Sequence, residues 1–422
     1  MKLIILNIII FSNSIFGQPD SSKNDYANFG LNDLISSALK SNLNLEPIEY
    51  EKKILSAKIN QVNKQPSPML QFMIDYLPVN LENAGEYSLN YSQPLKLFGK
   101  LGAEENLAKL NARRPVIEKK ELENELIRSI KENYFLLSVN ERLSDFNQEF
   151  QQILNSITKS IEIKYSVGKG SQYEILKSNN EFQKLLLEDI DLKNNKRILI
   201  NNLEILSNLE LPENYKTKSV EILLIINPPV FDTAQLIREM KDNNTDFQYL
   251  NQMIEENILE KNVSELERKP DLTLMSGYRY LSESKSNTLL FSISFDLPFM
   301  PWNEKRINAT IEEKVLTEKK LNSETKSLEQ NLKNDLKNVL TKISSSLEKI
   351  KYIKSILIPQ TEQTFKSSLI SYETAALEII EVLDSYRSLR ENNKILIEEE
   401  TNYLILISSL EKIIGKQIIT IN

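Results

Sequence analysis

The sequence has no cysteine and no histidine, and glycine occurs only nine times in 422 residues. Without cysteine the chain forms no disulfides and carries no lipid on an N-terminal cysteine. Without histidine it lacks ordinary zinc sites, histidine triads and imidazole acid–base chemistry. These absences remove common metal ligands and catalytic bases, and we expect no metal centre, no cofactor and no enzymatic activity.

The remaining composition favours long helices. Charged residues make up 26% of the chain, while glycine and proline are scarce. This composition suits long helices better than sandwiches or wound sheets. The formal net charge of −7 also makes the chain a poor candidate for nucleic-acid binding.

The first 17 residues, MKLIILNIIIFSNSIFG, have the pattern of a secretory signal peptide. Lys2 precedes a short apolar run, and small residues lie near a plausible cleavage point. The run is too short for a membrane-spanning helix, so we expect an exported protein. A buried N-terminal helix is the alternative interpretation.

The chain repeats itself once, which is the most informative feature of the sequence. The segment 165–176, YSVGKGSQYEIL, aligns with 372–383, YETAALEIIEVL. We therefore predict two repeats with the same order of elements, residues 18–212 and 213–422. The alignment pairs Tyr165 with Tyr372, Glu174 with Glu381, Leu176 with Leu383 and Pro68 with Pro270, and the string 97–100, LFGK, resembles 301–305, PWNEK.

Each repeat contains a predicted β-hairpin, at 69–94 and at 271–298. Apolar and aromatic residues alternate with polar ones along strands that are long enough to cross a bilayer when tilted. A hairpin packed on a soluble core shows the same alternation, so the pattern alone leaves both interpretations open. Strands in lipid cannot leave open edges, so four strands would have to be pooled with those of other copies.

Each hairpin precedes a long helical segment, 116–165 or 302–371, with apolar residues three, four or seven apart. Return helices follow at about 173–207 and 376–415. Pro115 and Pro359 should kink or divide the outgoing helices. Gly168 and Gly170 provide backbone freedom at the first reversal. The second repeat has Ala375 and Leu377 there, so we expect a less sharp turn.

In this order and at this spacing, five strings resemble the TolC-type outer-membrane efflux proteins: SQPLKLFGK (92–100), YSVGKGSQYEIL (165–176), GYRYL (277–281), SFDLPFMPWNEKR (294–306) and SYETAALEIIEVLDS (371–385). The first hairpin, GYRYL and DLPF look most like the cation and heavy-metal efflux branch. The resemblance implies a mainly α fold with a small β part, long α-helical hairpins and two β-hairpins. It also implies a homotrimer that forms a duct across the outer membrane and periplasm, with an adaptor protein and an inner-membrane pump as partners.

The resemblance also suggests roles for individual residues. The tips 165–172 and 372–379 would form the periplasmic entrance, and charged groups near them could latch it closed; a solvated tip without a latch is the alternative. Aromatic residues could form girdles at the membrane interfaces or merely fill the outer wall. The docking candidates are Tyr165, Val167, Gly168, Lys169, Gly170, Ser171, Tyr372, Ala375 and Ala376. The gate candidates are Lys169, Glu174, Glu381, Asp384 and Arg387, and the interface aromatics are Tyr76, Tyr87, Tyr91, Tyr278, Tyr280 and Trp302.

The sequence argues against three other functions. The segment 168–171, GKGS, lacks the spacing of a nucleotide-binding loop and has no strand before it. A coiled-coil structural or adhesion protein would explain the long helices but not the two hairpins of membrane-spanning length. A periplasmic adaptor would need glycine-rich lipoyl-like and barrel domains, which the sequence does not contain.

Overall fold

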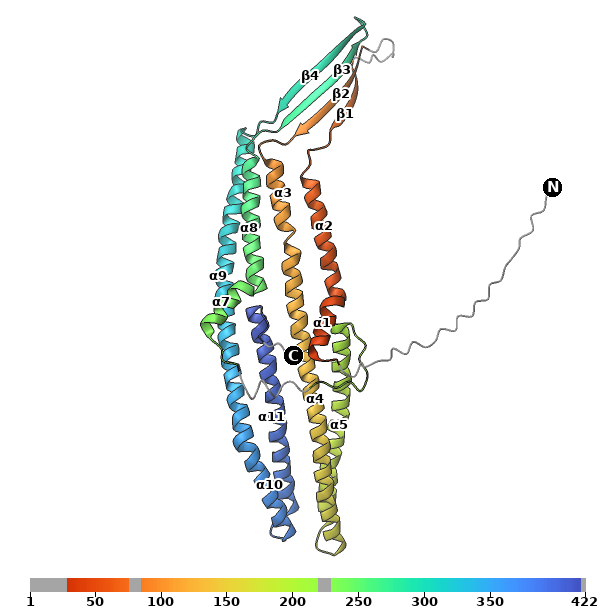
Figure 1. Ribbon diagram of the computed structural model, residues 1–422, viewed down its shortest axis with the longest axis vertical. Coiled ribbons are helices and arrows are strands. Elements are labelled where there is room, and N and C mark those ends of the chain that lie inside the picture. Colours follow the sequence, from red (N-terminus) through yellow and green to blue (C-terminus); the bar gives the residue numbers. More distant parts are fainter. Residues whose placement is uncertain (1–28, 76–84, 219–228, 419–422) are drawn as a thin grey trace, which may run out of the picture.

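The computed structural model describes residues 29–75, 85–218 and 229–418. The predicted signal peptide and Tyr76 lie outside these ranges. The molecule is an elongated bundle of helices with one sheet at its end (Figure 1). Its elements are α1 (Leu31–Ser41), the 3-10 helix η2 (Leu43–Leu45), α2 (Glu46–Val62), β1 (Met69–Asp75), β2 (Glu86–Leu95), α3 (Lys100–Asn111), α4 (Arg114–Ser166), α5 (Gln172–Ser207), α7 (Thr233–Asn243), α8 (Thr245–Leu266), β3 (Leu272–Leu281), β4 (Ser286–Phe295), α9 (Pro301–Tyr352), the π-helical turn η3 (Ile353–Leu357), α10 (Ile358–Glu373) and α11 (Ile379–Ile414).

The order of elements repeats along the chain. Helices α1 and α2 precede a strand pair, then α3, α4 and the return helix α5; α7 and α8 precede a second strand pair, then α9, α10 and α11. The predicted fold class, mainly helical with a small β part and an internal repeat, is confirmed.

The two prolines divide the outgoing helices in different ways. Pro115 lies in the first turn of α4, just after the break that ends α3. Pro359 lies in the first turn of α10, directly after the π-helical turn. Because proline has no N–H and its ring crowds the preceding turn, both helices change geometry on its N-terminal side.

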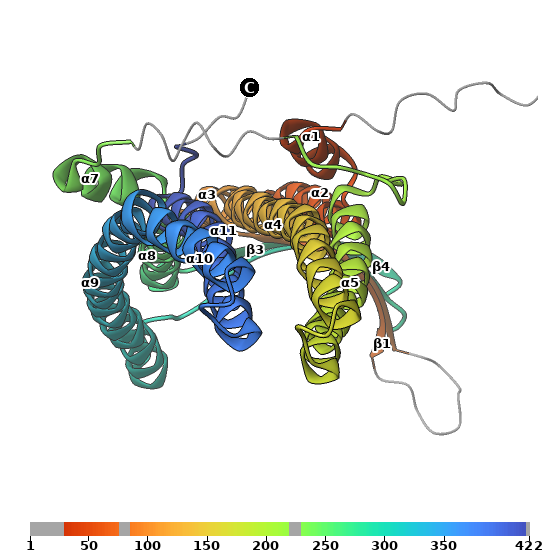
Figure 2. The same cartoon turned by 90° about the horizontal axis from the view of Figure 1, so that it is seen from below.

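Seams of buried side chains hold the long helices together. On α4, Ile130 and Leu137 are fully buried one heptad apart, and so are Leu154 and Ile161. One hydrophobic core lies in the middle of the bundle, where α1 and α7 pack onto the long helices. A second hydrophobic core lies towards the tips. Seen from below, the pair α10 and α11 lies beside the pair α4 and α5, and α1 and α7 lie on one side of these two pairs (Figure 2). None of the helices in the described ranges is both long enough and apolar enough to cross a membrane.

The four strands form one antiparallel sheet in the order β1-β2-β3-β4. The two repeats meet at its centre, where Tyr91 of β2 lies opposite Ser276 of β3. The sheet extends beyond the ends of the helices (Figure 1), and its outward side chains are exposed; Phe291, for example, is 78% exposed. Within the described residues, the outer edges of β1 and β4 pair with no other strand.

Candidate functional site at the helical tips

The first tip is a tight turn between α4 and α5. Lys169 N–H donates to the carbonyl of Lys164 (2.8 Å) and Gly168 N–H donates to that of Tyr165 (3.0 Å). Gly168 has φ = +73°. This pair of bonds around a left-handed residue is the Schellman arrangement that ends many helices, and it requires a residue that accepts positive φ.

The second tip has the same turn. Ala376 N–H donates to the carbonyl of Ser371 (2.8 Å), and Ala375 N–H donates to that of Tyr372 (3.1 Å). Ala375 takes φ = +59°, the left-handed conformation that Gly168 takes in the first tip. The expectation of a less sharp second turn is therefore wrong: alanine adopts the strained conformation because the helices on both sides require the same reversal.

Two gate candidates have a local role at the start of the return helices. The Glu174 carboxylate accepts from the N–H of Ser171 (3.0 Å), while the Ser171 hydroxyl accepts from the N–H of Glu174 (3.4 Å). In the second repeat the Glu381 carboxylate accepts from the N–H of Glu378 (2.9 Å). Such caps satisfy free N–H groups and contribute about 1 kcal/mol each, so both glutamates have a structural function whether or not they latch the tips.

A lysine joins the two tips. Lys164 Nζ, from the last turn of α4, donates to the main-chain carbonyl of Tyr372 and lies 3.5 Å from the centroid of its ring. Tyr372 is only 5% exposed, and burial followed by the nearby charge of Glu174 raises the pKa of its phenol to about 12. The lysine also places a positive charge at the C-terminal end of α10, where the helix dipole is negative.

Ion pairs connect α5 of the first repeat to α11 of the second. Arg387 Nη2 lies 3.0 Å from Glu181 Oε1, and Arg387 also pairs with Asp384. Burial would raise the pKa of Glu181, but hydrogen bonds from Arg387 and Lys184 outweigh this effect and lower it. One turn further on, Arg390 pairs with Glu188. Of the gate candidates, Arg387 therefore lies where the two repeats meet, and Asp384 pairs with it from the same helix.

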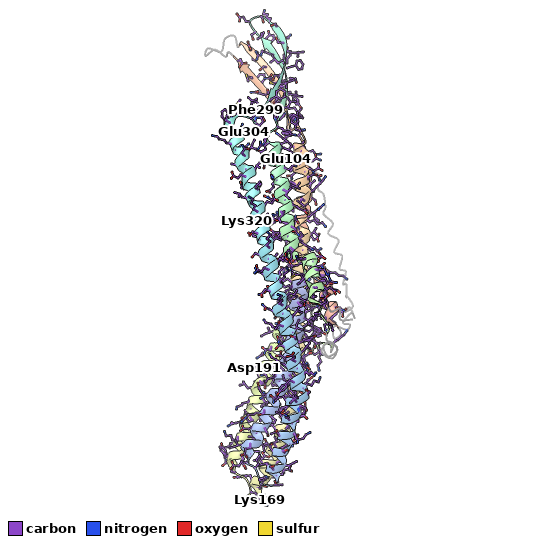
Figure 3. All side chains as sticks on the ribbon, turned by 90° about the vertical axis from the view of Figure 1, so that its left-hand side faces the viewer. Glu104, Lys169, Asp191, Phe299, Glu304 and Lys320 are labelled. Carbon is purple, nitrogen blue, oxygen red and sulfur yellow. The ribbon has the colours of Figure 1, made fainter. Side chains whose placement is uncertain are left out.

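The docking candidates fall into two groups. Tyr165 is 48% exposed and Val167 is 63% exposed, and Lys169, the outermost labelled residue at this end in Figure 3, is also exposed. Gly168, Ser171, Ala375 and Ala376 are exposed as well, whereas Gly170 is half-buried. Tyr372 instead packs into the core, so its side chain is not part of the tip surface.

Sequence reasoning missed Lys164 and Glu181, which make two of the contacts between the repeats near the tips. Both are ordinary charged residues within helical segments, and their partners are more than 200 positions away in the chain. The only indication of them in the sequence is that both lie close to the repeated tip strings. Within the described residues, no group of three or more aspartate or glutamate side chains is placed to hold a metal ion.

The sheet has one apolar and one polar face. Of the aromatic candidates, Tyr87 and Tyr280 lie directly opposite each other near the end farthest from the helices, and Tyr278 lies one row below. Tyr91 lies halfway along its strand, and Trp302, in the first turn of α9, is 69% exposed. The exposed side chains of the apolar face are Leu70, Phe72, Ile74, Tyr87, Leu89, Tyr91, Leu274, Tyr278, Leu289, Phe291, Ile293 and Phe295.

Comparison with known proteins identifies the fold. No family model and no curated protein matches the sequence. The solved structure of CusC, which forms a transmembrane channel, matches with a TM-score of 0.77 at 17% identity, over 94% of this chain and 96% of that one. The open MtrE outer-membrane channel of Neisseria gonorrhoeae matches with a TM-score of 0.73 at 14% identity, over 93% and 91%. The outer-membrane protein VceC of Vibrio cholerae gives 0.71 at 15% identity, over 92% and 96%. At these identities the likeness shows a shared fold over nearly the whole chain.

Proposed function

We propose that this chain belongs to the TolC-type outer-membrane efflux proteins and is one protomer of a homotrimeric channel. In this role it provides a passive exit for substrates that an inner-membrane pump and a periplasmic adaptor deliver. The observation that carries the proposal is the sheet: its apolar face is exposed, and both its edges are free within the described residues. An exposed apolar sheet with free edges is unfavourable both in water and in lipid unless other copies complete it.

In the proposed assembly the sheets of three copies close around a polar lumen, with their apolar faces towards the lipid. The long helices extend into the periplasm and continue the duct to the tips. A non-transporting coiled-coil protein remains the second interpretation, but it gives no reason for the amphipathic sheet.

The tips are the proposed entrance and docking surface. Apolar side chains are exposed there on both helices of the first tip; they include Ile163 (65%) and Tyr173 (53%). A partner that covers these side chains would remove them from water, which is the main source of affinity in such contacts. The pair Arg387–Glu181 and the contact Lys164–Tyr372 hold α11 and α10 against the first repeat, so opening the entrance requires both to break.

The identity of the transported substrate is a separate question from the formation of a channel. A water-filled channel does not need to bind what passes through it, and the absence of histidine and cysteine leaves few ligands for soft metals. Membership of the cation and heavy-metal branch remains a prediction from the sequence strings alone. Copurification with a tagged pump would identify the transport system.

Purified protein extracted from outer membranes tests the proposal. We expect a heat-modifiable trimer in detergent and discrete single-channel conductance in a planar bilayer. A water-soluble monomer that gives no conductance would overturn both the channel and its location.

The docking surface has its own test. A Cβ at Gly170 would lie 3.0 Å from the main-chain N of Tyr165, and Gly168 has positive φ, so Gly168→Val with Gly170→Val should distort the first tip. We expect intact trimers but loss of efflux in cells that lack the native protein. Gly102→Val is the matched control, because no atom beyond its chain neighbours and its own helix backbone lies within 4 Å of its added Cβ. Unchanged efflux in the double variant would contradict the assignment of the entrance.

A further inference from the structure

The described strands contain three charged side chains, Asp75, Glu86 and Arg279. Asp75 lies directly opposite Glu86 in the pairing of β1 with β2, and Glu86 Oε2 lies 3.3 Å from Arg279 Nη1 on β3. Because side chains alternate between faces, all three lie on the polar face, opposite the exposed aromatic side chains. The charges are therefore gathered on one side of the sheet.

They are also gathered at one end of the sheet. Asp75 is the last residue of β1 and Glu86 the first of β2, so both lie at the end farthest from the helices (Figure 1). The adjoining turn between β3 and β4 adds Glu283 and Lys285, which are of opposite sign. The rows nearer to the helices are uncharged on this face.

The arrangement is unfavourable for the stability of the sheet alone. Two carboxylates directly opposite each other on neighbouring strands repel. Arg279 pairs with Glu86, while Asp75 forms no ion pair with any residue in the described ranges. Each copy therefore presents two carboxylates for one guanidinium at this end of the polar face.

We propose that Asp75, Glu86 and Arg279 form a charged ring at the outer mouth of the channel that makes the mouth favour cations. The inference rests on the proposed function, in which the polar faces of several copies line one lumen. A ring of net negative charge raises the local concentration of cations and lowers that of anions. Arg279 limits this preference, so it and the carboxylates set the selectivity together.

The test is the reversal potential of the full-length trimer in a planar bilayer with a KCl gradient. The recording is made at low salt, because the Debye length is about 10 Å at 0.1 M and charges are screened beyond it. We expect the native channel to favour potassium. Asp75→Asn with Glu86→Gln leaves Arg279 alone and should reverse the preference, and Arg279→Gln should increase it. A change of about one kT in the local potential alters each ion's concentration about threefold.

Two further variants support the interpretation. Asp75→Asn alone removes a charge without breaking the pair of Glu86 with Arg279, so it tests the proposal even if the other variants assemble poorly. Glu304→Gln is the matched control, because Glu304 is an exposed carboxylate at the start of α9, at the opposite end of the sheet (Figure 3). We expect Glu304→Gln to leave the reversal potential unchanged.

The outcomes separate the two proposals. Native protein that forms neither trimers nor channels overturns the proposed function. If the native protein forms channels and neither Asp75→Asn nor the double variant shifts their reversal potential, the charged-ring proposal is overturned while the channel assignment stands.

Discussion

At the scale of single residues, the two tips solve the same problem with different side chains. Gly168 and Ala375 both adopt positive φ and make equivalent hydrogen bonds. For a residue with a Cβ, the left-handed conformation costs roughly 1–2 kcal/mol, whereas glycine adopts it freely. The second tip therefore contains backbone strain that the first avoids.

Exchanging glycine and alanine between positions 168 and 375 should move the backbone strain from the second tip to the first. Gly168→Ala should destabilise the first turn by about 1 kcal/mol, and Ala375→Gly should stabilise the second by a somewhat smaller amount, because glycine also gains freedom in the unfolded chain. Hydrogen exchange at the amides of Lys169 and Ala376, which close the two turns, measures the effect. We expect about fivefold faster exchange at Lys169 in Gly168→Ala and slower exchange at Ala376 in Ala375→Gly. Equal rates in native and variant proteins would show that the turns are unstrained.

At the scale of elements, local patterns in the sequence were sufficient for the fold class. Heptad spacing marks the long helices, and alternation over about ten residues marks the strands, because both depend on neighbours in the chain. The sharp turn of the second tip could not be predicted, because the sequence has no glycine there and it is packing that imposes positive φ on Ala375. The contacts of Lys164 with Tyr372 and of Glu181 with Arg387 could not be predicted, because they depend on how distant helices pack.

The contact between the tips is open to direct measurement. Lys164→Met keeps the apolar stem but removes the charge that lies against the Tyr372 ring, an interaction of about 1 kcal/mol. We expect the entrance to open more often, with an open probability about fivefold higher in single-channel recordings. Lys159→Met is the matched control, because Lys159 is an exposed lysine on the same helix and makes no ion pair or ring contact among the described residues. If Lys164→Met leaves the open probability at the level of Lys159→Met, the contact between the tips is not the latch.

The ion pair between α5 and α11 predicts a dependence on pH. The pKa of Glu181 is lowered from its ordinary value of 4.5. Its stabilisation of the contact between α5 and α11 is therefore fully present above pH 4.5 and is lost as pH falls through the lowered pKa. Arg387 stays charged throughout, because its hydrogen bond to Glu181 raises the pKa of its guanidinium. We expect a constant open probability at neutral pH and a rise below about pH 4.5. Glu181→Gln should raise the open probability at neutral pH and weaken the acid response; an unchanged acid response would exclude this pair as its cause.

At the scale of the whole molecule, the repeat predicts how copies join. Within one chain, β2 of the first repeat pairs with β3 of the second. The repeat makes β4 equivalent to β2 and β1 equivalent to β3. The same pairing between copies would place β4 of one protomer against β1 of the next, which uses both free edges of the sheet.

The register of this strand pairing between copies follows from the alignment of the two repeats. Pro68 aligns with Pro270, which places Ile74 at the position of Ser276. Aligning the first residues of LFGK (97–100) and PWNEK (301–305) places Tyr91 at the position of Phe295.

Because Tyr91 lies opposite Ser276, Phe295 should lie opposite Ile74 of the neighbouring copy. The chain contains no cysteine, so Ile74→Cys with Phe295→Cys can be oxidised without a native background. We expect covalent trimers on a non-reducing gel, since Cβ atoms of directly opposed residues are about 4.5–5.5 Å apart. Ile74→Cys with Leu289→Cys is the control, because position 289 lies about 20 Å further along the strand. Monomers alone in both variants would mean that the sheet edges do not meet, and a trimer held only by its helices would then have to replace the continuous barrel.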